Sequence, residues 1–353
     1  MTALITAVQT RVIRVPLARP WGADVTDLGV IEVRITRSDG AVGHGFSWTP
    51  SIGASAVDAL LRDDLTPWLL GRPADASLWQ QAWEHVHEAG GGGVTTIALA
   101  GVDLALWDLD LRERGISLAT ALGRHHESQP AYGSGVNLHY PLAELVEQVG
   151  RWRDAGYGAV KIKVGKPELA EDIDRVAAVR DTIGPDIALM IDANQRWELP
   201  GAIRAVHELS RFGLHWIEEP LRSDDTRGYR ALREAVGVPV ALGENVHTLH
   251  RFRDLVDAGA IDVLQPNVVR VGGITPFLSI AQLAREAGLT LAPHLLPELS
   301  AQLAFALPET TWVEDVEDAG FGDLGALLEP SGVVIAHGRA SGGDQPGIGI
   351  RFR

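Results

Sequence analysis

The architecture of this chain can be read from residues 159–220, AVKIKVGKPELAEDIDRVAAVRDTIGPDIALMIDANQRWELPGAIRAVHELSRFGLHWIEEP. Short apolar runs alternate here with amphipathic segments, and the runs end on charged residues at Lys163, Asp192 and Glu218. Apolar β-type runs separated by helical segments are typical of parallel strands joined by crossover helices. The stretch therefore predicts a β-α-β-α-β unit.

The same alternation continues along the chain from Tyr132 onward. Strand-like runs end near eight residues: Asn137, Lys163, Asp192, Glu218, Glu244, Pro266, His294 and Glu314. Amphipathic segments fill the intervals, for example Leu142–Ala155, Glu171–Ile183, Pro200–Leu209 and Ile274–Ala287. Eight strands at this spacing predict a (β/α)8-type barrel, in which active sites lie at the C-terminal ends of the strands.

The residues before the barrel predict a smaller domain of mixed structure. We expect strands at Ala7–Leu17, Val30–Arg37 and Val42–Trp48, a hairpin at Asp39-Gly40, and helices at Ala54–Leu70, Ala76–Glu88 and Thr95–Arg114. The last stretch, Leu327–Arg353, is rich in glycine and strand-like, and is expected to return to the first domain.

The composition excludes several classes of protein. Asp and Glu total 46 against 31 for Lys and Arg, which gives a formal net charge of −15. Such a surface repels phosphate backbones and anionic lipids, so we expect neither nucleic acid nor a membrane as partner. The chain has no cysteine, which rules out disulfides and cysteine nucleophiles. Because no signal sequence or long apolar run is visible, the cytoplasm is the expected location.

Three acidic residues break the pattern of parallel strands, which are normally apolar throughout because both faces are buried. Asp192, Glu218 and Glu244 end consecutive strands at steps of 26 residues. Carboxylates that converge without a counter-charge repel one another. A divalent cation would relieve this repulsion, and oxygen ligands favour Mg²⁺, with Mn²⁺ as a substitute. Zinc is disfavoured because no histidine accompanies these acids at ligand spacing.

Basic residues end two other predicted strands. Lys161 and Lys163 are two residues apart, so both side chains lie on one strand face and are expected to point into the barrel mouth. His294 ends the seventh strand, which faces the second strand across an eight-stranded ring. We therefore expect Lys163 and His294 to flank a substrate bound at the metal.

The ordered set of motifs resembles the mandelate racemase group of the enolase superfamily. The motifs are Lys161-x-Lys163, Asp192-Ala193-Asn194, Glu218-Glu219-Pro220, Gly243-Glu244-Asn245, Gly272-Gly273, His294 and Glu314. Residues 103–108, DLALWD, resemble a capping-domain helix, and residues 346–350, PGIGI, resemble the C-terminal return. The resemblance implies a modified (β/α)7β TIM barrel with an α+β capping domain formed by the N-terminal region and the C-terminal tail. The expected boundaries are 1–125 for the capping domain, 126–320 for the barrel and 321–353 for the returning segment.

The resemblance also implies roles for residues at the strand ends. Asp192, Glu218 and Glu244 would bind Mg²⁺, while Lys163 and His294 would act as acid and base on opposite faces of the substrate. A Lys or His base with Mg²⁺ is a known pattern of this superfamily. The physical reason is that an α-proton beside a carboxylate is removed only where positive charge is preorganised next to it.

Other residues are expected to assist these groups. By resemblance, Lys161 and Asn194 would contact the substrate carboxylate or its neighbour, and Glu314 would hydrogen-bond the enediolate oxygen. Lys161 and the metal are expected to lower the pKa of Lys163, because like charges disfavour its protonated form. The resemblance further implies a homo-oligomer.

One residue departs from the family pattern. Asn267 stands after Leu264-Gln265-Pro266, where the family usually has an Asp that orients the histidine and supports its charged form. An amide can orient the imidazole but cannot stabilise imidazolium by charge. The hypothesis is that His294 is a weaker partner in two-base racemisation than its counterparts are.

The motifs specify removal of an α-proton from a small carboxylic acid, and several reactions share that step. The leading interpretation is dehydration of a sugar acid to a 2-keto-3-deoxy acid. Racemisation or epimerisation of a 2-hydroxy acid and lactone cycloisomerisation use the same groups and remain alternatives, and a non-catalytic carboxylate-binding barrel is a remote one. Specificity is expected from residues 20–27, with Trp21 and Asp24, and from residues 48–53, where a packing role is the alternative for Trp21.

Overall fold

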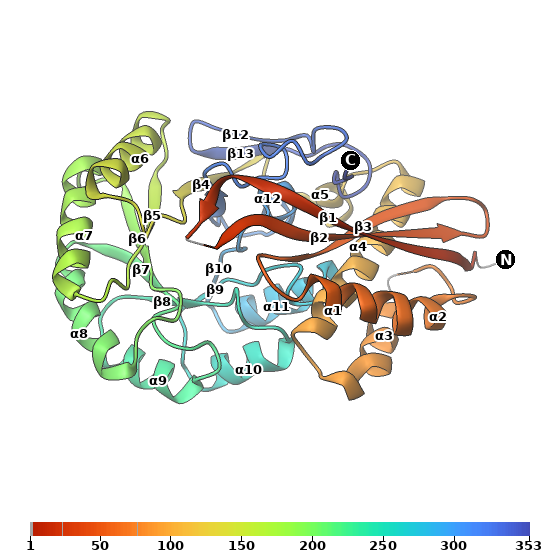
Figure 1. Ribbon diagram of the computed structural model, residues 1–353, viewed down its shortest axis with the longest axis horizontal. Helices are drawn as coiled ribbons and strands as arrows, with labels where there is room; N and C mark the ends of the chain where they lie inside the picture. Colours follow the sequence, from red (N-terminus) through yellow and green to blue (C-terminus); the bar gives the residue numbers. More distant parts are fainter. Residues whose placement is uncertain (1–2, 23, 76) are drawn as a thin grey trace.

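The computed structural model describes residues 3–22, 24–75 and 77–353. An antiparallel sheet with helices on one side lies against a ring of parallel strands that carries its helices on the outside (Figure 1). Within the described ranges, no helix is long and apolar enough to cross a membrane.

The first body is built on three antiparallel strands, β1 (Ile5–Trp21), β2 (Val25–Arg37) and β3 (Val42–Thr49). Its helices are α1 (Ala54–Ala59), η1 (Leu60–Leu65), α2 (Thr66–Leu69), α3 (Leu78–Val86), η2 (His87–Ala89), α4 (Val94–Arg114) and α5 (Leu118–Ala121). The expected helix at Ala54–Leu70 therefore contains a π-helical turn, η1. Ala76, the expected start of the next helix, lies outside the described residues.

Helix α4 packs directly on strand β3, and two glycines of the strand permit this. A Cβ atom at Gly43 would lie 2.0 Å from the carbonyl oxygen of Ala105, and one at Gly45 would lie 2.2 Å from that of Gly101. Real side chains do not fit at such distances, so the helix and the strand meet backbone to backbone.

The second body is a barrel of eight strands: β4 (Ser128–Ser134), β5 (Ala159–Lys163), β6 (Ala188–Asp192), β7 (Leu214–Glu218), β8 (Val240–Leu242), β9 (Val263–Leu264), β10 (Thr290–Leu291) and β11 (Val313–Val316). Strands β4 to β10 are parallel neighbours in chain order, and β11 pairs with β4. The helices between them are α6 (Leu142–Asp154), α7 (Leu169–Ile183), α8 (Leu199–Ser210), α9 (Thr226–Ala235), α10 (Leu249–Asp257), α11 (Ile274–Glu286) and α12 (Pro297–Phe305). This arrangement confirms the predicted (β/α)7β barrel with a capping domain.

Several polar residues lie beyond the strand ends at which they were expected. Strand β8 ends two residues before Glu244, and β10 ends three residues before His294. Strand β4 ends at Ser134, and Asn137 instead accepts the backbone N–H of Lys163 with its Oδ1 at 2.9 Å. The loops at the barrel mouth turn away from the sheet, so the paired strand is shorter than the apolar pattern suggests.

The C-terminal residues contact both the barrel and the capping domain. Strands β12 (Val333–Ala336) and β13 (Arg339–Gly342) form a hairpin that pairs with β4, which places it on the barrel rather than on the capping sheet. Beyond the hairpin, Ile348 donates its N–H to Asp108 of α4 at 3.0 Å. The ring of Phe352 packs edge-on against Phe46 of β3, with centroids 5.4 Å apart. The domain boundaries at 125 and 320 remain predictions.

A second joint links the capping domain to the barrel. Asp103 of α4 accepts the N–H of Thr275, at the start of α11, at 3.0 Å and its hydroxyl at 2.6 Å. Trp107 donates its indole N–H to the same hydroxyl at 3.0 Å. The segment that resembles a capping-domain helix is therefore bonded to the barrel.

Candidate active site

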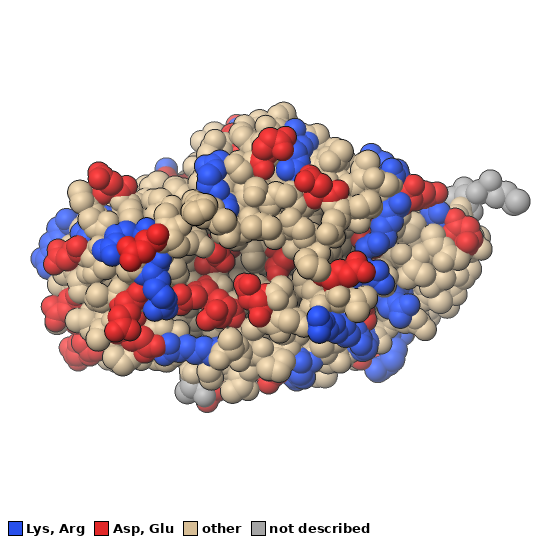
Figure 2. Space-filling view, turned by 90° about the horizontal axis from the view of Figure 1, so that it is seen from above, with Lys and Arg blue, Asp and Glu red and all other residues tan. Residues whose placement is uncertain are grey.

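A cavity of about 180 Å³ lies where the barrel strands end beneath the capping domain. The capping domain contributes Trp21, Trp48 and Pro50, and the barrel contributes Ser134, Val136, Lys163, Asn194, Glu244, Arg270, His294, Leu295, Glu314 and Val316. Figure 2 shows acidic side chains gathered around a hollow near the middle of the molecule. An anion that enters the barrel mouth therefore depends on the few cationic groups there.

Strand register brings three charged residues into one row. Lys163 of β5 lies opposite Asp192 of β6, and Asp192 lies opposite Glu218 of β7. Each of them is the last residue of its strand. Because neighbouring parallel strands end at the same edge, the sequence spacing becomes a line of charges across the barrel mouth.

The acidic residues converge, and a histidine joins them. One potential ligand atom from each of Glu218, Glu244 and His294 lies within 4.8 Å of the others. Asp192 is adjacent, but its carboxylate pairs with Lys163 and accepts the N–H of Asn194 at 2.7 Å. The sequence argument that no histidine accompanies the acids is therefore wrong, because distance along the chain does not measure distance across a barrel.

Burial affects these carboxyl groups unequally. Burial raises the pKa of Glu218 to about 7, against the opposing effect of the Lys161 ammonium. Burial also opposes ionisation of Glu244, but the neighbouring His294 holds the pKa of that carboxyl well below its usual value. Each acid thus ionises only as far as a neighbouring hydrogen-bond donor or positive charge allows.

The two lysines of one strand have different surroundings. Lys161 is 1% exposed, and its Nζ lies 2.8 Å from both Glu218 and Glu314 and 3.9 Å from Asp192. It lies beneath the carboxylates and is not among the residues that line the cavity. The expectation that both lysines point into the mouth is met only by Lys163.

Lys163 lines the cavity and pairs with Asp192. Burial lowers the pKa of its ammonium, but the carboxylates of Asp192, Glu244 and Glu218 together raise that pKa overall. Lys161 lowers the pKa of Lys163 as expected, but the carboxylates around the ammonium act more strongly, so that the pKa rises overall.

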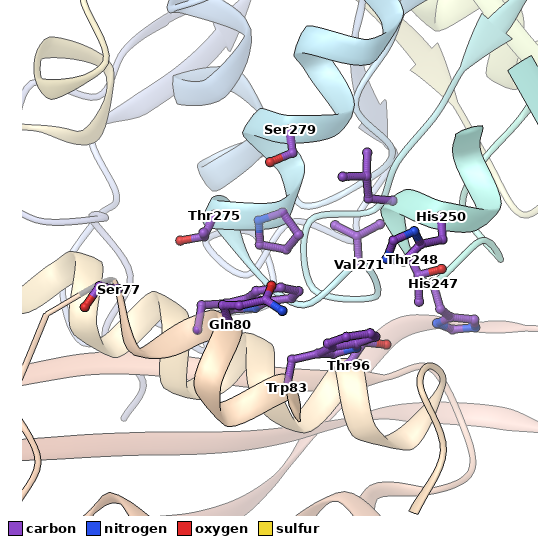
Figure 3. Close-up of a pocket in the computed structure, with 13 residues that line it drawn as sticks. Ser77, Gln80, Trp83, Thr96, His247, Thr248, His250, Val271, Thr275 and Ser279 are labelled. Atoms are coloured by element: carbon purple, nitrogen blue, oxygen red, sulfur yellow. The ribbon is translucent and has the colours of Figure 1, made fainter. Parts of the chain in front are cut away.

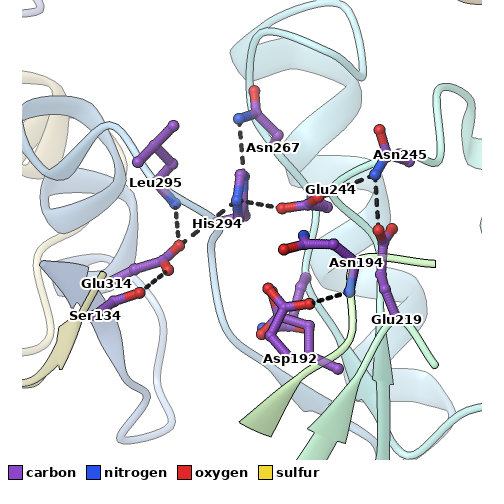
Figure 4. A network of polar contacts seen from close by, with 12 residues as sticks. Ser134, Asp192, Asn194, Glu219, Glu244, Asn245, Asn267, His294, Leu295 and Glu314 are labelled. Carbon is purple, nitrogen blue, oxygen red and sulfur yellow. Dashed lines mark hydrogen bonds and ion pairs between the residues drawn. The ribbon is translucent and has the colours of Figure 1, made fainter. Parts of the chain in front are cut away.

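Asn267 forms a hydrogen bond with the ring of His294 (Figure 4). The Oδ1 of Asn267 accepts the backbone N–H groups of Val269 at 3.0 Å and Arg270 at 3.2 Å. Its Nδ2 therefore faces the Nδ1 of His294, at 3.0 Å. Since an amide nitrogen only donates, Nδ1 accepts, and the ring proton belongs on Nε2. Nε2 lies 2.5 Å from Glu244 and 3.7 Å from Glu314.

Both carboxylate oxygens of Glu314 are bound by neighbouring donor groups, which fix the side chain in place. Oε1 accepts from the Ser134 hydroxyl at 2.8 Å and lies 2.8 Å from the Lys161 ammonium, and Oε2 accepts the N–H of Leu295 at 2.9 Å. Burial opposes its ionisation, but Lys161 and His294 lower the pKa of Glu314 to about 2. Leu295 has a φ of +54°, a conformation that costs a β-carbon-bearing residue energy and that aims its N–H at the carboxylate.

The residues expected to bind substrate divide into two groups. Trp21 and Asn194 line the cavity. Trp21 also packs against the hydrophobic core, so both roles considered for it have support. Asp24 is exposed and does not line the cavity, because it follows the tip of the β1–β2 hairpin at which Trp21 turns inward.

Two polar lining residues were missed from the sequence. Ser134 is the true end of β4, and Arg270 lies three residues after Asn267 on the loop that follows β9. A polar residue just after a predicted strand was the signal used elsewhere, and it applies to Arg270 as well. Trp48, which lies in the expected 48–53 turn, faces Arg270 with its ring centroid 6.0 Å from the guanidinium carbon.

A larger cavity, of about 260 Å³, lies at the seam between α3 and α11 (Figure 3). Trp79, Trp83 and His247 are among its lining residues, and no carboxylate is. Lys163, Glu244, His294 and Glu314 line the smaller cavity, which we take as the candidate active site.

Comparison with known families gives a match over nearly the whole chain. A family described as "Mandelate racemase / muconate lactonizing enzyme, N-terminal domain" matches residues 2–123, and one described as "Enolase C-terminal domain-like" matches residues 144–353. These matches agree with the resemblance drawn from the strand-end motifs.

Individual proteins are similar over most of their length. A 3,6-anhydro-α-L-galactonate cycloisomerase of Streptomyces coelicolor is 38% identical, over 98% of this chain and 96% of its own. An L-talarate/galactarate dehydratase of Salmonella typhimurium is 38% identical, over 83% of this chain and 74% of its own. The crystal structure of a racemase from Streptomyces coelicolor with bound magnesium superposes with a TM-score of 0.92 at 37% identity, covering 99% and 97% of the two chains.

Proposed function

The chain belongs to the mandelate racemase and muconate lactonizing enzyme family, and from this premise we propose that it is a Mg²⁺-dependent lyase. Its substrate in this proposal is a sugar acid, which it dehydrates to a 2-keto-3-deoxy acid. The observation that carries the proposal is the single cavity in which Lys163 and His294 meet beside converging carboxylates.

We propose Asp192, Glu218 and Glu244 as the metal ligands. Carboxylate oxygens suit Mg²⁺, with Mn²⁺ as a substitute, and the buried Glu218 lacks enough positive charge to ionise fully at neutral pH. Bound Mg²⁺ would supply positive charge beside the substrate carboxylate and so reduce the cost of forming a dianion there.

Lys163 is the proposed base. Once Asp192 is engaged as a metal ligand it would no longer stabilise the Lys163 ammonium, which favours the neutral amine. The Nζ of that amine takes the α-proton, and the electrons of the C–H bond enter the enediolate. The C–O bond to the β-hydroxyl then breaks, and the leaving oxygen takes a proton to form water. The enol that remains gains a proton at its β-carbon and becomes the 2-keto-3-deoxy acid.

His294 takes a supporting part in this scheme. With Asn267 donating to Nδ1, the Nε2–H is a hydrogen-bond donor toward the substrate rather than a second base. Neutral imidazole serves as such an electrophile in other enzymes. Glu314 and Asn194 line the same cavity as proposed partners of the substrate oxygens. Lys161, which lies below the cavity, is assigned to holding Glu218 and Glu314 in place of the expected substrate contact.

The names of the relatives cover all three reactions considered. One is named as a dehydratase, another as a cycloisomerase and a third as a racemase. Two-base racemisation is the least favoured, because Asn267 leaves only one group able to accept a proton. Lactone cycloisomerisation is therefore the second candidate.

The test is a panel of aldonic acids, aldaric acids and their lactones, incubated in D₂O with enzyme stripped of metal and then supplied with Mg²⁺. Loss of water with a 2-keto product is expected, and Lys163→Ala should lower the rate by at least about 10³-fold. Calorimetry should show Mg²⁺ binding that Glu218→Gln weakens. Absence of Mg²⁺ binding at saturating metal would reject the lyase and favour a barrel that only binds carboxylates.

We also propose a homo-oligomer that works in the cytoplasm without nucleic acid. The support is the family resemblance together with the net charge of −15. Sedimentation velocity that gives a mass near 37.9 kDa would refute the oligomer.

A further inference from the structure

We propose that Arg270 and Trp48 bind a second carboxylate, so that the preferred substrate is a dicarboxylic sugar acid. This inference rests on the proposed function, because it concerns the far end of the same substrate. The family names leave the point open, since one relative is named for a diacid and another for a monoacid.

Arg270 is an uncommitted cation in an acidic protein. It lines the cavity, yet in residues 3–22, 24–75 and 77–353 it forms no ion pair with any carboxylate. Its one side-chain partner is the neutral Oδ1 of Asn245, which accepts from Nη1. A guanidinium has five N–H donors arranged in a fork that matches a carboxylate. Most of these donors therefore remain free to bind a ligand.

Trp48 supplies a second donor without a partner. It is 2% exposed and lines the same cavity, and its indole Nε1 is buried with no hydrogen-bond partner among the described residues. Buried indole N–H groups usually have an acceptor. A ligand oxygen in the cavity would satisfy this group.

The side chains of Trp48 and Arg270 lie next to each other in the cavity. The Trp48 ring lies 6.0 Å from the guanidinium carbon of Arg270. They come from opposite bodies, β3 of the capping domain and the loop after β9 of the barrel, and they close the cavity between them. The remaining capping residues that line it, Trp21 and Pro50, offer an apolar wall.

The backbone of Arg270 is also fixed relative to His294, one of the two proposed catalytic side chains. Its backbone N–H donates to Asn267, the residue that supports His294. A substrate whose α-carbon lies between Lys163 and His294 would therefore meet Arg270 at a set distance. A sugar diacid presents a carboxylate at that end, whereas an aldonic acid presents a neutral hydroxyl.

The experiment compares galactarate with galactonate, which differ only at the far end. In the Mg²⁺-loaded enzyme, kcat/KM and calorimetric affinity are expected to favour galactarate by at least about tenfold. Arg270→Met and Trp48→Phe should each reduce this preference about tenfold or more, mainly through KM. Arg222→Met is the control, because Arg222 is an exposed arginine that does not line the cavity.

The outcomes separate this inference from the function on which it rests. Turnover of galactonate at a rate equal to that of galactarate would overturn the diacid site and leave the lyase intact. Tighter binding of galactarate without turnover of either acid would support the diacid site and count against the lyase. If the Arg270 and Trp48 variants lose kcat/KM equally with galactarate and with galactonate, the two residues have only a structural role and the inference is overturned.

Discussion

Asn267 shows how one atom can change the chemistry available to a site. Where an Asp accepts a hydrogen bond from the Nδ1–H of the neighbouring histidine, Nε2 is free to accept a proton. In this chain the amide oxygen is taken by two backbone N–H groups, so the amide nitrogen faces the ring. Turning the amide over would place donors against donors in a buried site, which costs more than one hydrogen bond. The substitution thus favours one-base reactions.

Asn267→Asp should therefore restore a second base. We expect exchange of the α-proton on the His294 face to rise at least about tenfold, because a carboxylate would accept from Nδ1–H and free Nε2. Deuterium incorporation into both α-epimers of the substrate in D₂O measures this. Asn267→Ala is the control, since it removes the donor without adding an acceptor. Identical pH–rate profiles for wild type and Asn267→Asp would refute the hypothesis.

Helices α4 and α11 are joined by a buried polar contact between the two bodies. Asp103 is 1% exposed and lies at the first turn of α11, where it accepts two hydrogen bonds from Thr275. Burial outweighs these bonds and raises the pKa of Asp103 to about 7. The folded chain therefore retains a proton on Asp103 that the unfolded chain releases near pH 4.

The sign of the resulting pH dependence follows from linkage. Between about pH 4 and 7 the native state binds more protons at Asp103, so this group makes unfolding easier as the pH rises. Between pH 5 and 8, wild type should lose roughly 2–3 kcal/mol of unfolding free energy relative to Asp103→Asn. Urea unfolding at both pH values measures this difference. A constant difference between the two proteins would mean that the pKa of Asp103 is not raised.

Across the whole molecule, the chain closes on itself through its C-terminal residues. The hairpin of β12 and β13 extends the barrel at β4, and the residues after it reach the capping sheet. Phe352 packs edge-on against Phe46 of β3 and against Phe321, with ring centroids 5.4 and 5.0 Å apart. The capping domain is thus held to the barrel at both α11 and the tail.

Phe352→Ala should destabilise the whole protein. Removal of a buried aromatic ring typically costs about 3–5 kcal/mol, and Phe352 is 6% exposed. Leu328→Ala is the matched control, because Leu328 is 49% exposed and its truncation should change stability by less than about 0.5 kcal/mol. Urea unfolding compares the two variants. An equal effect of both substitutions would show that the tail does not hold the bodies together.

The barrel and the row of charged strand ends could be predicted from the amino-acid order, because their signals are local. Strand and helix periods repeat within a few residues, and parallel strands end at a common edge. Asp192, Glu218, Lys163 and His294 were found in this way. The strand pattern shows which side chains share a face, but it does not show how deep each one lies in the barrel. Lys161 and Lys163 share a face but lie about 6–7 Å apart along the strand, so one lies under the carboxylates while the other reaches the cavity.

The partners of each side chain depend on packing between distant segments. Trp48 and Arg270 are more than two hundred residues apart, and only the docking of β3 and α4 on the barrel brings them to one cavity. The same holds for the hydrogen bond between Asn267 and His294, which follow different strands of the barrel and lie 27 residues apart. Contacts of this kind depend on three-dimensional distance, to which residue order and periodicity are not sensitive.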